Sequence, residues 1–284
     1  MEFKVYRDIN EFFDKTKPFY LADEAVHNLP YGILNRMIQG VSQNGDELPF
    51  MALIESEGEV ILSFLQTPPH NMIISSNKSI DPELLHFAAG ELISEGVSLP
   101  GVIGSKELAE SFAAVWGERT GSRQQIEMNQ RIYKLEKVNS IPKPIGRFAP
   151  AEHSHIPLIL VWAKEFCKET GVLYEEARMQ TSVRESFAAK STFVWLDTDG
   201  HPVTMAKAGR KIENGTVVTL VYTPLELRGK GYASACVGEL SREILKTSQF
   251  CCLYTDLANP VSNSIYMKIG YEPICDSIAL KFLR

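Results

Sequence analysis

The sequence predicts an α/β protein whose two halves share one order of helices and strands. Three observations lead to this fold class. In each half, two amphipathic helical segments precede three strand-like runs. Residues 138–144 carry two prolines without hydrophobic periodicity, near the middle of the chain. In the second half the third strand leads into glycines that open a helix, whereas the first half has no glycine at the corresponding place.

In the first half, the patterns predict two helices, three strands, and then helices alternating with strands. Pro18 is expected to separate the first two helices, because proline lacks the N–H that a helix interior needs. Asp81 and Pro82 have the residue types of an N-cap and a first helical position. The expected elements are helices over 9–15, 19–39, 82–95 and 105–116, and strands over 50–54, 60–65, 71–75, 101–104 and 130–135.

The second half repeats this order. Two turns, at 198–200 and 213–215, carry the Asp-Gly and Asn-Gly pairs that favour tight hairpins between antiparallel strands. We expect domains at 1–137 and 145–284, joined by a linker at 138–144. The expected elements are helices over 149–169, 173–190, 231–246 and 261–269, and strands over 192–196, 203–210, 217–223, 251–255 and 278–283.

Composition limits the function classes. A length of 284 residues, with 44% hydrophobic and 23% charged residues, is ordinary for a globular protein. The net charge of −6 disfavours non-specific nucleic-acid binding, which needs a basic surface. Residues 1–15 lack the apolar core of a signal peptide, and no window approaches about 18 uninterrupted apolar residues. We expect a cytoplasmic monomer or homodimer that binds neither nucleic acid nor membrane.

Side chains that bind metals are sparse. The five cysteines show no disulfide-framework spacing, so buried, reduced thiols are expected. His153 and His155 stand two positions apart at a helix start, which does not bring both rings to one ion. His201 follows Gly200 in a hairpin turn and is expected to be exposed. No metal site is predicted.

The stretch 216–233 has the clearest binding chemistry. A run of β-branched residues ends in a short loop, and Arg228, Gly229, Lys230 and Gly231 then open a helix. Amides at a helix N-terminus lack intrahelical partners and the helix dipole favours an anion, so a phosphate is the expected ligand. The pattern is neither GxxxxGK[ST] nor GxGxxG, and it follows the third strand of a hairpin series. Both a nucleoside-triphosphate loop and a nicotinamide-binding turn are therefore disfavoured.

Two motifs follow one another in this half. The first, Arg-x-x-Gly-x-Ala between a Val-rich strand and a long helix, stands at Arg228, Gly231 and Ala233. The second, an asparagine after a strand and then Tyr-x-x-x-Gly before an aromatic residue, stands at Asn259, Tyr266, Gly270 and Tyr271. In order and spacing they resemble the acetyl-coenzyme A signature of the GNAT (GCN5-related) N-acetyltransferases. The motifs cover the chain from residue 216 onward, and the order of elements extends the resemblance back to about Pro144.

The resemblance implies a tandem GNAT-like fold: mixed, mostly antiparallel sheets, flanked by helices and splayed at the middle, with the cofactor in the split. The first half would be a degenerate copy, because residues 75–79 contain no glycine. The implied acyl donor is acetyl-coenzyme A (acetyl-CoA). Its expected contacts are Leu220, Val221, Tyr222, Arg228, Gly229, Lys230, Gly231, Tyr232, Ala233, Asn259 and Asn263.

Elementary chemistry agrees with this assignment. The amides from Arg228 to Ala233 suit a pyrophosphate, with added charge from Lys230 or Arg228. A strand ending at residues 220–222, with its neighbour splayed away, would offer backbone groups to the two amides of a pantetheine arm. Asn259 either hydrogen-bonds this arm or caps the following helix, since Asn-Pro is a good helix-start pair.

Tyr266 is the candidate general acid, a role that the resemblance implies. A phenol of pKa about 10 protonates a thiolate of pKa about 8.5 at a cost of about 2 kcal/mol. An alkylammonium of pKa about 10.4 loses its proton at pH 7 at a cost of about 4–5 kcal/mol. Deprotonation of the amine is the larger demand, so Tyr266 would contribute a modest factor. The alternative is that Tyr266 packs in the core against Tyr271 or Phe282.

The acceptor is left open by the sequence. Glu175 and Glu176 lie where the resemblance places an acceptor pocket, although such residues more often form a solvated helix face, and no general base is assigned. The leading function is an N-acetyltransferase in which a primary amine of a small molecule attacks the thioester directly. The alternatives are the same chemistry on a protein or peptide amine, and a non-catalytic acyl-CoA-binding protein.

Overall fold

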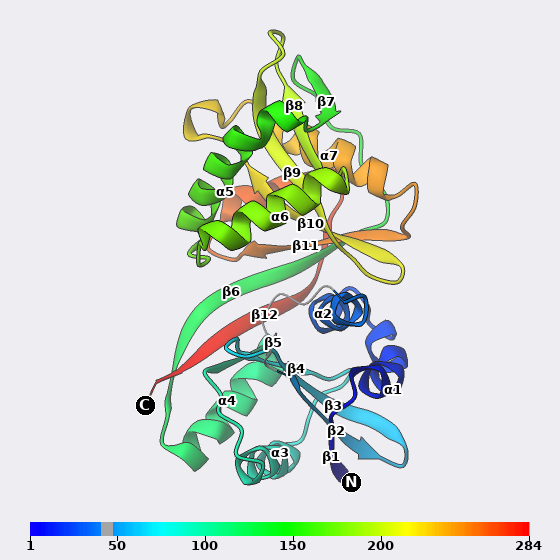
Figure 1. The fold of residues 1–284 in the computed structure, drawn as a ribbon, viewed down its shortest axis with the longest axis vertical. Coiled ribbons are helices and arrows are strands. Elements are labelled where there is room, and N and C mark those ends of the chain that lie inside the picture. The colour runs from blue at the N-terminus through cyan, green and yellow to red at the C-terminus, as the bar shows by residue number, and fades with distance from the viewer. Residues whose placement is uncertain (41–47, 284) are drawn as a thin grey trace. The chain divides into compact units, whose positions relative to one another are not determined.

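A computed structural model describes residues 1–40 and 48–283 (Figure 1). The contacts among them divide the chain into two units, Met1–Ile132 with Ile274–Arg284, and Tyr133–Pro273. The C-terminal strand is therefore part of the first unit. The domain boundaries expected from the sequence, 1–137 and 145–284 with a linker at 138–144, stay a prediction. Residue 284 of the expected second domain lies outside the described residues.

The first unit holds strands in the order β1-β2-β3-β4-β5-β12. Neighbours are antiparallel except for β4 and β5, and β12 places Ser277–Lys281 opposite Ser105–Gly101 of β5. Helices α3 and α4 pack through Leu85, Leu92 and Phe112 against the sheet residues Phe64 and Val102. The elements are β1 (Glu2–Tyr6), α1 (Ile9–Leu21), α2 (Asn28–Ile38), β2 (Phe50–Ser56), β3 (Glu59–Gln66), β4 (Met72–Ser75), α3 (Pro82–Ser94), β5 (Gly101–Ser105), α4 (Lys106–Thr120), β6 (Arg123–Leu135) and β12 (Glu272–Leu283).

Pro18 does not separate the first two helices, so this expectation was wrong. Helix α1 runs through Pro18 to Leu21, and Ala22 N still donates to Pro18 O at 3.2 Å. The buried face formed by Phe12, Thr16, Phe19 and Tyr20 holds the helix together across the missing N–H, because packing outweighs local propensity. By contrast, Asp81 caps α3 as predicted, accepting from Glu83 N at 2.8 Å.

In the second unit, β7, β8, β9 and β10 are antiparallel neighbours, and β11 pairs with β10 in parallel. The last residues of β6, from Tyr133, also belong to this unit. A short 3₁₀ turn at His153–His155 precedes α5. The elements are β7 (Arg147–Pro150), α5 (Ile156–Thr170), α6 (Glu176–Ala188), β8 (Thr192–Leu196), β9 (Pro202–Lys211), β10 (Gly215–Tyr222), α7 (Tyr232–Ile244), β11 (Phe250–Asp256) and α8 (Pro260–Ile269).

The two faces of the sheet in the second unit carry separate cores, because successive strand residues point to opposite sides. On one face, Val194, Met205 and Tyr222 pack with residues of α5 and α6 such as Trp162 and Phe187. On the other, Trp195, Ala206 and Val218 pack with residues of α7 such as Val237 and Leu240. The predicted fold class, a mixed sheet flanked by helices, is confirmed, and the elements from β1 to β6 recur in the same order from β7 to β12.

The expected linker is packed against the second unit. Asn139 N donates to Ile269 O at 2.8 Å, and Arg242 Nη2 donates to Asn139 O at 2.9 Å. Lys143 forms an ion pair with Glu239, and a Cβ placed on Gly238 would lie 3.0 Å from Ile141 Cδ1. We call residues 138–144 the strap, since they run from the end of α8 across α7.

The first strand of each half, β1 and β7, was not predicted from the sequence; both are short and carry charged residues. Among the described residues, none of the helices combines the length and the apolar character that crossing a membrane requires.

Candidate active site

Within the second unit, the sheet opens between β10 and β11. Their parallel pairing joins Gly215 to Phe250, Thr216 to Cys251 and Val217 to Cys252, and the described pairing ends there. Strand β10 continues to Tyr222 and β11 to Asp256. The β11-facing edge of β10 beyond Val217 therefore leaves the ladder, which is the splay that the family resemblance implies.

A β-bulge bends β10 within this opening. Thr219 pairs with Lys207 and Tyr222 with Met205, so β10 has one residue more than β9 in this interval. Leu220 takes up the extra length with a φ of +53°, a left-handed conformation that costs a non-glycine residue about 1–3 kcal/mol. Leu220 and Val221 are half-buried, whereas Tyr222 is buried. Because of the bulge, Leu220 and Val221, two of the predicted cofactor contacts, lie outside the regular pairing between β10 and β9.

The glycine loop places an open helix N-terminus next to this strand end. Gly229 and Gly231 have φ values of +77° and +83°, which favour glycine. Gly231 is the N-cap of α7 and no side chain caps the helix. A Cβ on Gly229 would meet nothing within 4 Å, and one on Gly231 would meet only Pro144 Cδ at 3.9 Å. The first-turn amides, from Tyr232 and Ala233 onward, are available to an anion.

Arg228 anchors this loop rather than projecting from it. Its Nη2 donates to both carboxylate oxygens of Glu169 in α5, at 2.8 and 2.7 Å, and its Nε donates to Thr223 O at 2.8 Å. Its backbone N–H donates to Leu225 O at 3.2 Å, so this amide is already used. Lys230 is exposed, which leaves its ammonium as the cation of the loop. Nothing in the helical pattern around Glu169 distinguished it beforehand from a surface carboxylate.

The surroundings of Tyr222 beneath the loop raise the pKa of its phenol. Burial raises the pKa of the Tyr222 phenol, the Glu169 carboxylate raises it further, and the Arg228 guanidinium acts in the opposite direction. The guanidinium carbon of Arg228 lies 5.7 Å from the ring centre of Tyr222. The strand end, α5 and the loop are therefore tied together at one point.

Asn259 and Asn263 shape the start of α8. Asn259 Oδ1 accepts from Ser262 N at 3.0 Å, so Asn259 is the N-cap of the helix. Asn263 Nδ2 donates to Asp256 O at 3.0 Å and to Asn259 O at 2.7 Å, and its Oδ1 accepts from Tyr133 Oη at 2.9 Å. Contact of either residue with a cofactor stays a prediction.

Tyr266 lies on α8 among other rings. Its ring centre is 6.5 Å from that of Tyr133 and 5.9 Å from that of Tyr271. The side chain is 8% exposed, and burial raises its pKa to about 12. No hydrogen bond joins the Tyr266 hydroxyl to another of the described residues. Tyr266 therefore packs in the core, and a donor role for its hydroxyl stays a prediction.

Glu175 and Glu176 lie at the exposed start of α6. Glu175 is the N-cap, and Glu176 Oε1 accepts from Gln180 Nε2 at 3.3 Å, an interaction within the helix. No described contact joins either carboxylate to the glycine loop or to Tyr266. Their part in binding an acceptor stays a prediction, and no general base is identified among the described contacts.

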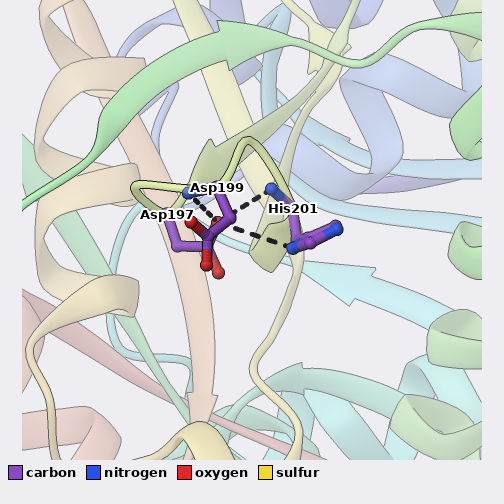
Figure 2. A group of neighbouring side chains, drawn as sticks. All are labelled: Asp197, Asp199 and His201. Atoms are coloured by element: carbon purple, nitrogen blue, oxygen red, sulfur yellow. Dashed lines mark hydrogen bonds and ion pairs between the residues drawn. The ribbon is translucent and has the colours of Figure 1, made fainter.

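The turn between β8 and β9 brings together Asp197, Asp199 and His201, as Figure 2 shows. Asp197 Oδ1 accepts from the backbone N–H of Asp199 at 3.0 Å and of His201 at 2.8 Å. The His201 ring is 77% exposed, as its place in the turn predicted. These backbone bonds account for the position of Asp197 through turn formation alone.

Comparison with known proteins agrees with this geometry. Residues 201–279 match the family model described as FR47-like protein, which spans the opening, the glycine loop and α8. No curated protein matches the chain in sequence. Among solved structures, a GCN5-related N-acetyltransferase from Sphaerobacter thermophilus has a TM-score of 0.66 at 14% identity and covers 99% of this chain and 96% of that one.

A GNAT-family acetyltransferase from Colwellia psychrerythraea has a TM-score of 0.63 at 10% identity and covers 100% of both chains. A tandem GNAT protein from the clavulanic acid biosynthesis pathway has a TM-score of 0.56 at 10% identity, covering 99% of this chain and 98% of that one. The chain is a tandem GNAT-fold protein. The family match covers residues 201–279, and the likeness to solved structures over the whole chain shows the GNAT fold.

Proposed function

We propose that this tandem GNAT protein transfers an acetyl group from acetyl-CoA to a primary amine of a small molecule. The observation that carries the proposal is the opening between β10 and β11 directly beside the uncapped N-terminus of α7. One site then offers both free strand backbone and an anion-binding helix end.

The residues present fit acetyl-CoA. The α7 amides, with no Cβ on Gly229 or Gly231 to block them, suit the pyrophosphate. The unpaired edge of β10 beyond Val217 suits the amides of the pantetheine arm, which would pair with it as an added strand does. When bound, acetyl-CoA supplies the thioester that an amine attacks. The exposed Lys230 adds a positive charge near the phosphates, while Arg228 holds the loop in place.

Tyr266 carries a proton that it keeps over the working pH range. Its pKa of about 12 means that the Oη–H is intact at neutral pH. Donation to a thiolate of pKa about 8.5 is uphill by about 2 kcal/mol for an unshifted phenol, and the raised pKa of Tyr266 increases this cost. A hydrogen bond from Oη to the sulfur costs less than complete proton transfer. Tyr266 therefore acts as a hydrogen-bond donor to the leaving sulfur and raises the rate by a modest factor.

An assay of thiol release tests the function. The full chain is incubated with acetyl-CoA and a panel of small primary amines, polyamines and lysine-containing peptides, and acetylated products are identified by mass spectrometry. We expect turnover with a subset of the small amines. Turnover with peptides alone would mean that the acceptor is a protein or peptide amine and not a small molecule. Tight acetyl-CoA binding without turnover on any amine would contradict the enzymatic proposal.

A further inference from the structure

Tyr133 near the end of β6 comes from the last strand of the first repeat, yet it is built into the second unit. Its side chain is 1% exposed and its hydroxyl donates to Asn263 Oδ1 at 2.9 Å. A buried phenol needs such a partner, because an unpaired buried hydroxyl is costly. The motif analysis of the second half did not include this residue, which lies upstream of the strap.

The Asn263 side chain also hydrogen-bonds to two other elements, β11 and the start of α8. Its Nδ2 donates to Asp256 O, at the last residue of β11, and to Asn259 O, at the N-cap of α8. With the Tyr133 bond, the amide group of Asn263 is held on both its donor and its acceptor side. The first turn of α8 is thereby fixed to the end of the strand that borders the opening.

Tyr266 lies three residues after Asn263 on the same helix, so the two side chains are neighbours along one face. The Tyr133 ring also packs against the Tyr266 ring, with 6.5 Å between their centres. On its other side Tyr266 meets Tyr271, whose hydroxyl is hydrogen-bonded to Ser241 Oγ in α7 at 2.8 Å. Tyr133 therefore contacts Tyr266 both directly and through the start of α8. The Tyr271 side chain meets only the Tyr266 ring, and the Tyr271 backbone N–H donates to Tyr266 O at 3.0 Å.

We propose that Tyr133 is a positioning residue that holds Tyr266 in the opening by bracing Asn263 at the start of α8. This inference rests on the proposed function for its catalytic consequence, but the bracing itself is a property of the chain. It also gives the first repeat a part in the site of the second, because its last strand supplies the brace.

Hydrogen–deuterium exchange of the full chain tests the brace without any reaction. Loss of one hydrogen bond changes a local opening equilibrium by about fivefold. In Tyr133→Phe, peptides covering residues 257–266 should exchange about fivefold faster, while peptides of α7 exchange as in the wild type. Tyr271→Phe is the matched control, since it removes a buried hydroxyl from the other ring beside Tyr266 but leaves Asn263 untouched. Unchanged exchange over 257–266 in Tyr133→Phe, or equal loosening in the control, overturns the proposal.

Kinetics then test positioning. With an accepted amine, Tyr133→Phe should lower kcat by about fivefold and leave the Kd for acetyl-CoA within about twofold, because α7 and β10 are unaffected. In a Tyr266→Phe background, the same substitution should lower kcat by less than about twofold, since the group that it positions is gone. An equal loss in both backgrounds overturns the positioning role. A wild type without turnover contradicts the proposed function, and the exchange measurement still decides the brace.

Discussion

Gly231 combines two requirements that no other residue type meets together. Its φ of +83° favours glycine, and its missing side chain leaves the α7 amides open. Gly231→Asp places a carboxylate at this N-terminus, where it competes with the phosphates, so the Kd for acetyl-CoA should rise at least about tenfold. Isothermal titration calorimetry measures the change.

Gly200→Asp is its control, because Gly200 has the same φ of +83° with open space around it and lies in the β8–β9 turn. This variant should bind acetyl-CoA as the wild type does. Normal binding by Gly231→Asp would remove the glycine loop from the site.

Tyr266→Phe tests the donor role at a single atom. Because the pKa of Tyr266 is raised to about 12, the phenol stays neutral as pH rises from 7 to about 10. Turnover of the wild type should therefore rise through this interval as the amine acceptor loses its proton, without a fall caused by Tyr266. The variant should show the same rise at a level lower by about tenfold, with acetyl-CoA affinity unchanged. Steady-state rates across pH check both; a decline in wild-type turnover well below pH 10 that the variant lacks would contradict the raised pKa.

Several residue roles were visible in the sequence and others were not. The glycines could be predicted because their chemistry is local: a turn and an open helix end. The anchoring of Arg228 by Glu169 joins positions 59 residues apart, and the brace on Asn263 from Tyr133 spans 130. Such pairs depend on which elements pack together, which one sequence does not contain. The N-cap role of Asn259 was one of two alternatives, and its bond to Ser262 N is now seen.

At the scale of elements, the end of α8 shows how the residues that precede the strap shape the second unit. Gly270 follows α8 with a φ of +116°, and a Cβ there would lie 2.8 Å from Lys137 O and 3.1 Å from Leu135 Cδ1. Gly171 ends α5 in a left-handed conformation too, but a Cβ there meets nothing within 4 Å. We therefore expect Gly171→Ala to lower the free energy of unfolding by about 1–2 kcal/mol.

Gly270→Ala should lower it by about 3 kcal/mol or more, because the backbone carbonyl of Lys137 cannot move aside as a flexible side chain could. Urea unfolding of the two variants measures the difference. Equal losses would mean that residues preceding the strap do not press on this turn.

Most strands and helices were predictable because their hydrophobic periods and turn residues are local signals. The bulge at Leu220 was not, since it depends on the pairing of β10 with β9. Pro18 was misread because the buried face of α1 outweighs a local rule. The opening between β10 and β11 followed from the family resemblance and not from the pattern of residues in either strand.

At the scale of the whole molecule, the last strand of the chain joins the core of the first unit. Leu280 in β12 is 3% exposed, pairs with Val102 of β5, and packs in the core that includes Phe112 of α4. The sequence placed this strand in the second half, because chain order was its only guide. Residues far apart in the chain therefore share one core. A substitution in β12 should destabilise the residues that it packs against in the first unit, rather than those near it in the sequence.

Leu280→Ala tests this arrangement. Truncating a buried leucine costs about 2–5 kcal/mol, and the loss should appear where the side chain packs. Hydrogen–deuterium exchange of Leu280→Ala should therefore be faster in peptides of β5 and α4, covering residues 101–120, than in peptides of α7. Leu240→Ala, a buried leucine of α7 in the second unit, should give the opposite pattern. If Leu280→Ala instead made α7 exchange faster and left residues 101–120 protected, β12 would be stabilised by the second half of the chain and the proposed arrangement would be wrong.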